Sequence, residues 1–331
     1  MEFTIGGRLD VRITRADVGK RVSVRRRRDI GGTGAEFTDT VGVLTSWTDG
    51  VLSITRKSGE SVRIVESSLV AGKVVPAAPA RRRGPAASFG ELAAVTARAW
   101  QPVESEALGE WRLRAAAGFT RRANSVLPLG DPGLPVGEAL GRVRAWYAER
   151  GLPPYVQTAT GAAGTQEVLC AELERHGWRR EVSAQVRIAA LAPVGDGEPD
   201  GTAVRLTREP DAAWLSRYQR FSVPGPQVLP VLRSGPSVWF AAVAGDGDAP
   251  DAIGRCVVDG RWAGFMAVEV APERRRRGLA TAVMTALARR ALDEGASAAW
   301  LQVEEDNDGA RALYDGMGFA LHHHYHHYRP A

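Results

Sequence analysis

The stretch FMAVEVAPERRRRGLATAVMTALARRALDEG, residues 265–295, contains the pattern that decides the fold of this part of the chain. Its first six residues are mostly apolar and predict a strand, and Pro272 then stops strand pairing because proline has no backbone N–H. A basic loop that contains Gly278 leads into residues 281–294, where apolar residues recur at helical spacing until Gly295. The sequence therefore predicts a strand, a glycine-containing loop and a helix in direct succession.

A loop of this kind is suited to bind an anion. The first N–H groups of a helix lack partners inside the helix, and the helix dipole favours negative charge at that end. The loop reads Arg275-x-x-Gly278-x-Ala280, and its two small residues allow the backbone to approach a phosphate group closely. A solvated run of charge is the alternative interpretation of the arginines, but their position between a strand and a helix favours phosphate binding.

The strand, the proline, the basic loop and the helix resemble the coenzyme A signature of the GNAT superfamily of N-acyltransferases. The stretch LQVEEDNDGARALYDGMGF, residues 301–319, is similar to the second signature of that superfamily. The resemblance implies acetyl-CoA as cosubstrate, with no metal, and places the pyrophosphate on the loop. The implied loop contacts are Arg275, Arg276, Arg277, Gly278, Leu279 and Ala280.

The same resemblance implies roles for residues outside the loop. In the superfamily the strand before the loop splays from the next strand, and the pantetheine arm of the cofactor lies in the gap. Val268 and Val270 are therefore implied to contact pantetheine through backbone atoms, and the Asn307 side chain to hold the cofactor. Tyr314 is implied to point its hydroxyl at the sulfur, where a phenol could protonate the leaving thiolate. A buried tyrosine with a hydrogen-bonded hydroxyl is the alternative.

An amine acceptor requires a general base, because amines are mostly protonated at neutral pH. Glu269 lies on the predicted cofactor strand, and strand alternation puts it on the face opposite Val268 and Val270. We take Glu269 as the candidate base, with a solvent-facing strand glutamate as the alternative. Glu304 and Glu305, after the next strand, are further candidates.

The 331 residues are enough for two or three domains. Short predicted strands separated by turns indicate a small antiparallel barrel in residues 1–75, and their order resembles SH3-like barrels. We predict a linker at 76–87, a degenerate GNAT-like half at 88–192 and the catalytic acetyltransferase domain at 202–331. With the resemblance, the predicted fold class is α/β (α+β): a small SH3-like barrel followed by a tandem GNAT-like acyl-CoA N-acyltransferase fold.

The middle segment contains WRLRAAAGFTRRANSV, residues 111–126, which looks like a stretch of actinobacterial acetyltransferases whose first half is a degenerate GNAT-like repeat. It has no Arg-x-x-Gly-x-Gly/Ala loop, so we expect no coenzyme A there. Arg121 and Asn124 could contact the acceptor from a pocket wall, with packing and turn chemistry as the alternative. The order of the three segments resembles a mycobacterial-type acetyltransferase family reported to act on histone-like proteins, which makes a protein lysine a candidate acceptor.

The composition limits the class of protein. Hydrophobic residues make up 44% and charged residues 24%, which excludes disorder as the main state. No apolar run reaches the roughly 18 residues of a membrane helix, and we expect neither a signal peptide nor a membrane partner. The two cysteines, Cys170 and Cys256, fit no metal or redox spacing, and we expect a cytoplasmic protein. The net charge of +5 modestly favours anionic ligands.

Three further features are open to more than one interpretation. The run HHHYHH at 322–327 could place His322, His324 and His326 on one strand face as metal ligands, but a terminal strand of the superfamily type is the preferred reading. The sequence GGTG at 31–34 lacks the residues of a nucleotide loop and predicts a hairpin loop. The arginines at 25–28 could contact nucleic acid, with a solvated barrel edge as the alternative.

Two functions follow from these patterns. The first is an N-acetyltransferase that moves the acetyl group of acetyl-CoA to a primary amine by direct attack. The amine belongs to a protein lysine or to a small molecule. The alternative is a binding protein that senses coenzyme A, and whose barrel recruits a nucleic acid or a protein. Release of free thiol from acetyl-CoA in the presence of amines distinguishes the two.

Overall fold

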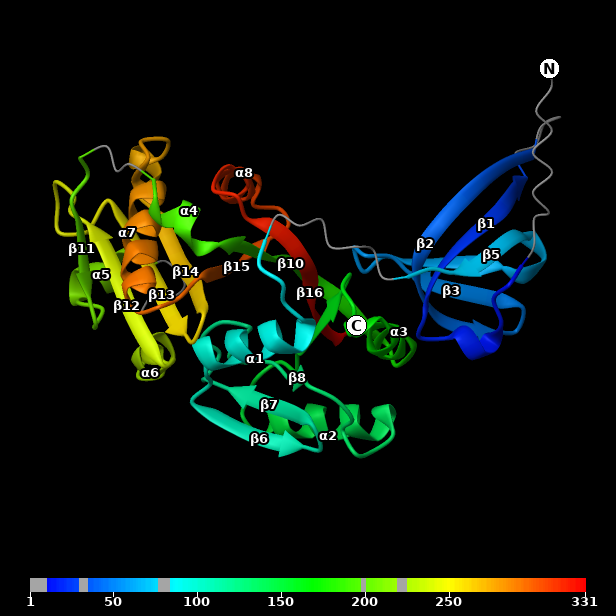
Figure 1. The fold of residues 1–331 in the computed structure, drawn as a ribbon. Helices are drawn as coiled ribbons and strands as arrows, with labels where there is room; N and C mark the ends of the chain where they lie inside the picture. Colours follow the sequence, from blue (N-terminus) through cyan, green and yellow to red (C-terminus); the bar gives the residue numbers. More distant parts are fainter. Residues whose placement is uncertain (1–10, 30–34, 77–83, 198–200, 219–224) are drawn as a thin grey trace, which may run out of the picture. The chain divides into compact units, whose positions relative to one another are not determined.

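The computed structural model describes residues 11–29, 35–76, 84–197, 201–218 and 225–331 (Figure 1). The sequence GGTG at 31–34, most of the predicted linker at 76–87 and residues 198–200 lie outside the described residues. The described chain forms two compact units, and these do not follow the order of the sequence. Residues 11–76 and 158–179 with Ala331 make the first unit, and residues 84–157 and 180–330 make the second.

The first unit contains a five-stranded antiparallel sheet. Its strand order is β4-β3-β2-β1-β5, and its core contains eight buried apolar side chains that include Trp47 and Leu52. Asp49 and Gly50 both have positive φ, which is the geometry of a tight hairpin turn between two strands and one that an Asp-Gly pair favours. The strands are β1 (Arg21–Asp29), β2 (Ala35–Thr48), β3 (Val51–Thr55), β4 (Ser61–Val65) and β5 (Leu69–Val74).

Helix α3 (Glu167–Arg175) belongs to this first unit and packs against β2. The loop before the helix contacts Lys57, whose carbonyl oxygen accepts a hydrogen bond from the Thr160 hydroxyl at 3.0 Å. Gly161 has a φ of 97°, and a Cβ on it would lie 2.6 Å from Lys57 Cγ. A glycine is therefore needed for this close approach. A piece of the middle segment is thus part of the core of the first unit.

The second unit is built on one large mixed sheet with the strand order β11-β12-β13-β14-β15-β10-β16-β9. β14 and β15 run parallel, whereas β11–β12, β12–β13, β13–β14 and β10–β15 are antiparallel. The chain passes between the two units within β9 and β10. The strands are β9 (Val156–Thr160), β10 (Trp178–Ala190), β11 (Val204–Thr207), β12 (Ser237–Val243), β13 (Ala252–Asp259), β14 (Trp262–Val270), β15 (Ala298–Glu304) and β16 (Ala320–Pro330).

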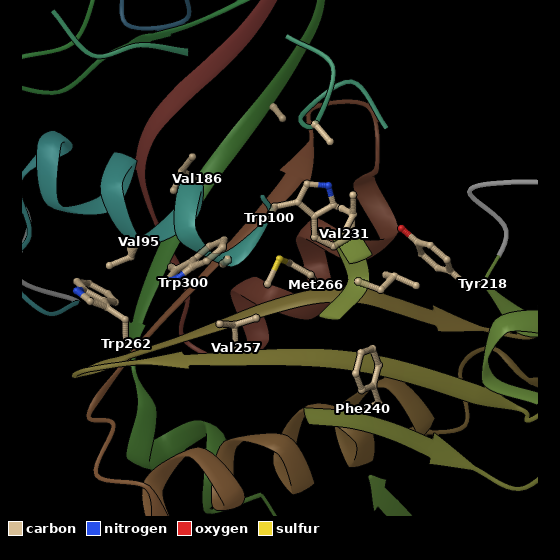
Figure 2. Packing of buried hydrophobic residues seen from close by; sticks show 14 of the residues in the cluster. Val95, Trp100, Val186, Tyr218, Val231, Phe240, Val257, Trp262, Met266 and Trp300 are labelled. Atoms are coloured by element: carbon tan, nitrogen blue, oxygen red, sulfur yellow. The ribbon is translucent and has the colours of Figure 1, made fainter. Parts of the chain in front are cut away.

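Two apolar clusters cover the two faces of this sheet. Along β15, Ala299 and Leu301 belong to one cluster and Ala298 and Trp300 to the other, as strand alternation requires. The cluster with Ala299 and Leu301 is here called the α7-side cluster. It includes residues of α7 (Leu279–Asp293), which lies across β12, β13 and β14 (Figure 1). The second, the α1-side cluster, includes residues of α1 (Phe89–Ala99), α5 (Ala212–Arg217) and α6 (Val228–Arg233), and part of it is shown in Figure 2.

Smaller elements complete the second unit. A three-stranded sheet contains β6 (Glu104–Leu108), β7 (Trp111–Ala115) and β8 (Leu127–Pro128). The remaining helices are α2 (Val136–Ala148), α4 (Leu191–Gly195) and α8 (Asp308–Gly316). The described chain thus has a small β-domain and a larger mixed α/β unit, as the predicted fold class requires.

Candidate functional site

The strands β14 and β15 are paired for only part of their length. Their parallel register runs from Trp262 opposite Ala298 to Phe265 opposite Leu301, although both strands continue beyond these residues. Past Phe265 no pairing between the two strands is present in the described chain. The main-chain groups that β14 turns toward β15 are therefore available to an extended ligand that carries amide groups.

A β-bulge lies at the start of this gap. The register of β14 against β13 shifts between Met266 and Glu269, so that two β14 residues face the single residue Gly254. Ala267, inside the shift, has a φ of 52°, in the left-handed region that alanine rarely adopts. A Cβ on Gly254 would lie 2.4 Å from Val283 Cγ1 of α7, so the close packing of α7 on the bulge requires glycine.

The bulge is followed by three residues that the sequence singled out. The side chains of Val268 and Val270 pack in the α7-side cluster, which leaves their main-chain atoms at the edge of the gap. Alternation puts Glu269 on the opposite face, toward the α1-side cluster, where Ala267 also packs. The two valines and the glutamate thus point to different faces, and their roles in binding and catalysis stay predictions.

The loop before α7 presents unused backbone donors. Arg276 has a φ of 63° and Gly278 a φ of 76°, and Gly278 is the N-cap residue of α7 without a side-chain cap. The first helical hydrogen bond is donated by the N–H of Ala282 to the Gly278 carbonyl at 2.9 Å. Within the described residues, no carbonyl accepts from the backbone N–H groups of 276–280. Unused backbone N–H groups in a loop with left-handed residues, at the start of a helix, form a concave site that suits an anion.

The side chains of the loop add positive charge to this site. Arg274 is paired with Asp246 and, at 3.3 Å, with Asp251. The next three arginines, 275–277, are exposed and form no ion pair with any carboxylate in the described part of the chain. The loop therefore combines free N–H groups with three guanidinium groups that lack a protein counter-charge, which is the chemistry that a pyrophosphate requires.

Asn307 and Tyr314 lie on or beside α8. The Asn307 side chain is exposed and caps the helix, because its Oδ1 accepts a hydrogen bond from the Ala310 N–H at 3.1 Å. Tyr314 is 9% exposed, and its ring packs edge-on against Phe319 with 6.0 Å between ring centroids. Burial raises the pKa of Tyr314 to about 12, so the phenol stays protonated at neutral pH. No described residue shares a hydrogen bond with its hydroxyl, as a proton donor aimed at a ligand requires.

The other candidate bases lie at the end of β15. Glu304 is the last residue of the strand and lies opposite Ala184 of β10. Glu305 is half-exposed, and its carboxylate contacts Nδ1 of His324 in β16. Glu305 is therefore already engaged by an imidazole, whereas the general base itself stays a prediction.

Asn124 and Arg121 have separate roles in the middle segment. Asn124 is buried, and its Oδ1 accepts hydrogen bonds from the N–H groups of Ala116 and Gly118, both at 2.9 Å. Its Nδ2 donates to two further carbonyls of the same loop, both at 2.8 Å. All of the Asn124 hydrogen-bonding groups are thus used in turn formation, which favours the packing alternative. Arg121 is exposed and pairs with Glu181 at 3.6 Å.

The sequence analysis missed Arg122, which contacts the catalytic sheet. Its guanidinium carbon lies 4.7 Å from the centroid of the Trp100 ring, and its Nη1 donates to Gln302 Oε1 at 2.5 Å. Gln302 directly follows Leu301, the last β15 residue that is paired with β14. No local signal separates Arg122 from its neighbour, because the contact joins residues 180 positions apart in the sequence.

The histidine run lies in β16, and its side chains have several environments. His322 Nε2 and the Ala87 carbonyl are 3.1 Å apart, and His326 Nδ1 and the Ser183 hydroxyl are 2.8 Å apart. His324 contacts Glu305, as described above. In the part of the chain that the structure describes, no three His, Cys, Asp or Glu side chains form a group that could hold a metal ion. His327 is buried, and neither ring nitrogen has a hydrogen-bond partner among described residues.

The separated strands, the bulge and the loop at the start of α7 are fold features of a GNAT-type N-acetyltransferase. The chain belongs to the family described as "Probable histone acetyltransferase Rv0428c C-terminal", whose model matches residues 87–328. A second family model, the "Rv0428c N-terminal Sm-like domain", matches residues 16–73. The sequence analysis compared this domain with SH3-like barrels, and the matching family describes it as Sm-like.

Relatives from two bacteria carry related names. The chain is 32% identical over 316 residues to the "Probable histone acetyltransferase Rv0428c" of Mycobacterium tuberculosis, with 93% of each chain covered. It is 25% identical to the "Uncharacterized N-acetyltransferase YobR" of Bacillus subtilis, over 70% of this chain and 95% of the relative. A solved GCN5-related N-acetyltransferase from Kribbella flavida shares the fold with a TM-score of 0.53, at 17% identity over 74% of this chain and 96% of that one.

These matches make the protein an N-acetyltransferase, and they confirm the class predicted from the sequence. Among the described helices, none is both long enough and apolar enough to cross a membrane.

Proposed function

We propose that this acetyltransferase moves the acetyl group of acetyl-CoA directly to a primary amine. The observation that carries the proposal is the gap between β14 and β15, which leads to a loop with free N–H groups and unpaired arginines. The gap fits an amide-bearing arm, and the loop fits a pyrophosphate. A molecule with both parts, such as coenzyme A, would place its thioester near the point where the strands separate.

The proposed reaction uses the two faces of the sheet. Glu269, directly or through a water molecule, takes a proton from the acceptor ammonium group. The amine nitrogen then attacks the thioester carbon and forms a tetrahedral intermediate. The C–S bond breaks, the electron pair stays on sulfur, and the Tyr314 hydroxyl protonates the thiolate. The nitrogen and Glu269 each release one proton to solvent, and solvent returns one proton to the tyrosinate, so that amide, free thiol and one proton are the products.

The acceptor class is suggested by the relatives. The name of the Mycobacterium tuberculosis relative describes a probable histone acetyltransferase, which makes a lysine of a basic protein a candidate acceptor. Small-molecule amines are the other candidate. We also infer a cytoplasmic location, which is supported by two buried cysteines, Cys170 and Cys256, that form no disulfide in the described chain.

The proposal is tested by measuring thiol release from acetyl-CoA with a library of amines and lysine peptides. Gly278→Asp should abolish acetyl-CoA binding in calorimetry, because it adds a carboxylate and a Cβ to the anion loop. Gly133→Asp is the matched control, since Gly133 has nearly the same φ, 73° against 76°, in a different loop of the same unit. Unchanged affinity in a folded Gly278→Asp protein contradicts the site. Acetyl-CoA binding without thiol release for any amine favours the coenzyme A-sensing alternative.

A further inference from the structure

The middle segment reaches the point where β14 and β15 separate. The loop between β7 and β8 is fixed by Asn124, and two of its non-glycine residues, Ala117 and Thr120, have left-handed backbone with φ of 44° and 57°. Non-glycine residues rarely adopt this conformation unless the surroundings hold it. The loop is therefore a fixed part of the second unit.

This loop and Trp100 together position Arg122. The Thr120 hydroxyl accepts a hydrogen bond from the Trp100 indole N–H at 2.9 Å. Trp100 is a buried member of the α1-side cluster, together with Met266 and Val231 (Figure 2). The Arg122 guanidinium stacks on this anchored ring, and the Gln302 side chain holds it from another side. Its orientation is thus set before any ligand binds.

Arg122 lies on the face that the acceptor must use. Trp300 belongs to the α1-side cluster, and alternation along β15 puts Gln302 on the same face. Glu269 also points to that face, whereas α7 covers the other. The hydrogen bond with Gln302, the first β15 residue that is not paired with β14, therefore holds the Arg122 guanidinium at the start of the gap. It lies on the same face of the sheet as Glu269, the candidate base.

The guanidinium of Arg122 has no counter-charge. It forms no ion pair with any carboxylate among the described residues, and Gln302 uses only one of its N–H groups. Arg255 makes a useful contrast, because it lies 5.0 Å from the same Trp100 ring but donates to three backbone carbonyls. Arg255 is saturated by the protein, and Arg122 is not.

His327 gives a second, independent sign of an anion on this face. The side chain is 2% exposed, and neither ring nitrogen has a partner within the described chain, although one nitrogen of a neutral imidazole must carry a proton. Burial holds the pKa of His327 well below its usual value, and the nearby Arg114, Arg121 and Arg122 lower it further. The buried imidazole and the Arg122 guanidinium thus both lack an acidic partner in the described chain, whereas Arg121 pairs with Glu181.

We propose that Arg122 is a specificity residue that binds a carboxylate of the acceptor, so that the preferred acceptor is an amine that also carries a carboxylate. The inference rests on the proposed function and names its substrate class. One free guanidinium edge presents parallel N–H groups that match the two oxygens of a carboxylate. The carboxylate comes from a free amino acid or from an acidic residue beside the lysine of a peptide.

The test compares acceptors that differ only by one charge. The free acids are L-lysine and β-alanine, each measured against its own amide, and the peptides contain Lys-Glu or Lys-Gln. We expect wild-type kcat/KM to be about 10- to 100-fold higher for the acids, the range of a charge-assisted hydrogen bond. Arg122→Gln should bring the ratio near one with an unchanged KM for acetyl-CoA, and Arg122→Lys should give an intermediate ratio. Arg112→Gln, an exposed arginine of β7, is the control and should keep the ratio.

The outcomes separate this inference from the proposed function. A preference for free acids identifies an amino-acid acceptor, and a preference for Lys-Glu identifies a peptide. Equal rates for every acid and amide, or a preserved preference in Arg122→Gln, overturn the inference. If no amine is acetylated, the proposed function fails, and calorimetry of the same acids and amides then decides about Arg122. Tighter binding of the acids that is lost in Arg122→Gln supports a carboxylate site, and equal binding refutes it.

Discussion

Tyr314→Phe is the sharpest test of the catalytic role proposed for Tyr314, because it should change the rate of the reaction much more than the stability of the fold. The substitution removes one hydroxyl and keeps the ring that packs against Phe319. Since no described residue bonds to this hydroxyl, no protein hydrogen bond is lost. We therefore expect a change in folding free energy within about 1 kcal/mol, the usual value of one hydrogen bond.

The effect on turnover should be much larger. General acid catalysis contributes about 10²–10⁴-fold, so kcat should fall by that factor with a saturating acceptor while acetyl-CoA affinity stays unchanged. The measurements are kcat, the acetyl-CoA dissociation constant and the melting temperature of the same variant. A wild-type kcat, with chemistry rate-limiting, removes Tyr314 from the mechanism and leaves the positioning of amine and thioester as the main source of rate.

The raised pKa adds a check on the environment of Tyr314. Its folded-state pKa of about 12 lies above the ordinary value of 10.0, because burial penalises the ionised phenolate, so the stability that the protein has below pH 10 is lost as the pH rises toward 12. A shift of this size corresponds to about 3 kcal/mol. Wild type should therefore lose melting temperature between pH 10 and pH 12 more steeply than Tyr314→Phe. Parallel pH profiles would show that the ring is hydrated.

Three other outcomes follow from particular contacts. Arg255→Met should lower the free energy of unfolding of the second unit by about 1–3 kcal/mol, because buried carbonyls of α1 and α6 lose the hydrogen bonds that Arg255 donates; an unchanged free energy of unfolding in thermal denaturation would contradict this. Gly161→Val should destabilise the first unit, since a Cβ would lie 2.9 Å from the Lys57 carbonyl oxygen, while acetyl-CoA affinity stays constant. Stability should also fall as the pH drops from 6.5 toward 3, because burial lowers the pKa of His323 and His326 to about 3 and the unfolded imidazoles bind protons first; His326→Gln should flatten this profile in acid titrations.

The elements whose ends are set by local chemistry were predicted well from the sequence. The helix expected at 281–294 begins two residues earlier, at Leu279, because Gly278 takes the left-handed cap position. Ser88 caps α1, since its hydroxyl oxygen accepts a hydrogen bond from the Glu91 N–H at 3.1 Å, and serine is a residue type that favours this position. Glycine, proline and capping residues act over three or four positions, so a single sequence reveals them.

Features that depend on packing could not be predicted. Ala267 carries no signal for its left-handed backbone, which lies in the bulge opposite Gly254, where Val283 of α7 packs closely on the sheet. The contact of Arg122 with Gln302 depends on how the middle segment lies on β15. Helix α3 belongs to the first unit because it packs against β2, a contact between residues far apart in the sequence. The order of the segments along the chain therefore could not reveal it.

The two faces of the large sheet differ in how strongly their proposed ligand contacts depend on residue type. Val268 and Val270 turn their side chains to α7 and leave only main-chain atoms at the gap, so the cofactor contacts proposed there would depend little on residue type. On the other face, the proposed acceptor site depends on side chains, because Arg122 contacts Trp100 and Gln302 through its guanidinium group. Arg122 and Trp100 both come from the middle segment. Substitutions in the middle segment should therefore alter KM for the acceptor without altering KM for acetyl-CoA. The degenerate half, which has no phosphate loop of its own, is in this view the part of the chain that selects the acceptor.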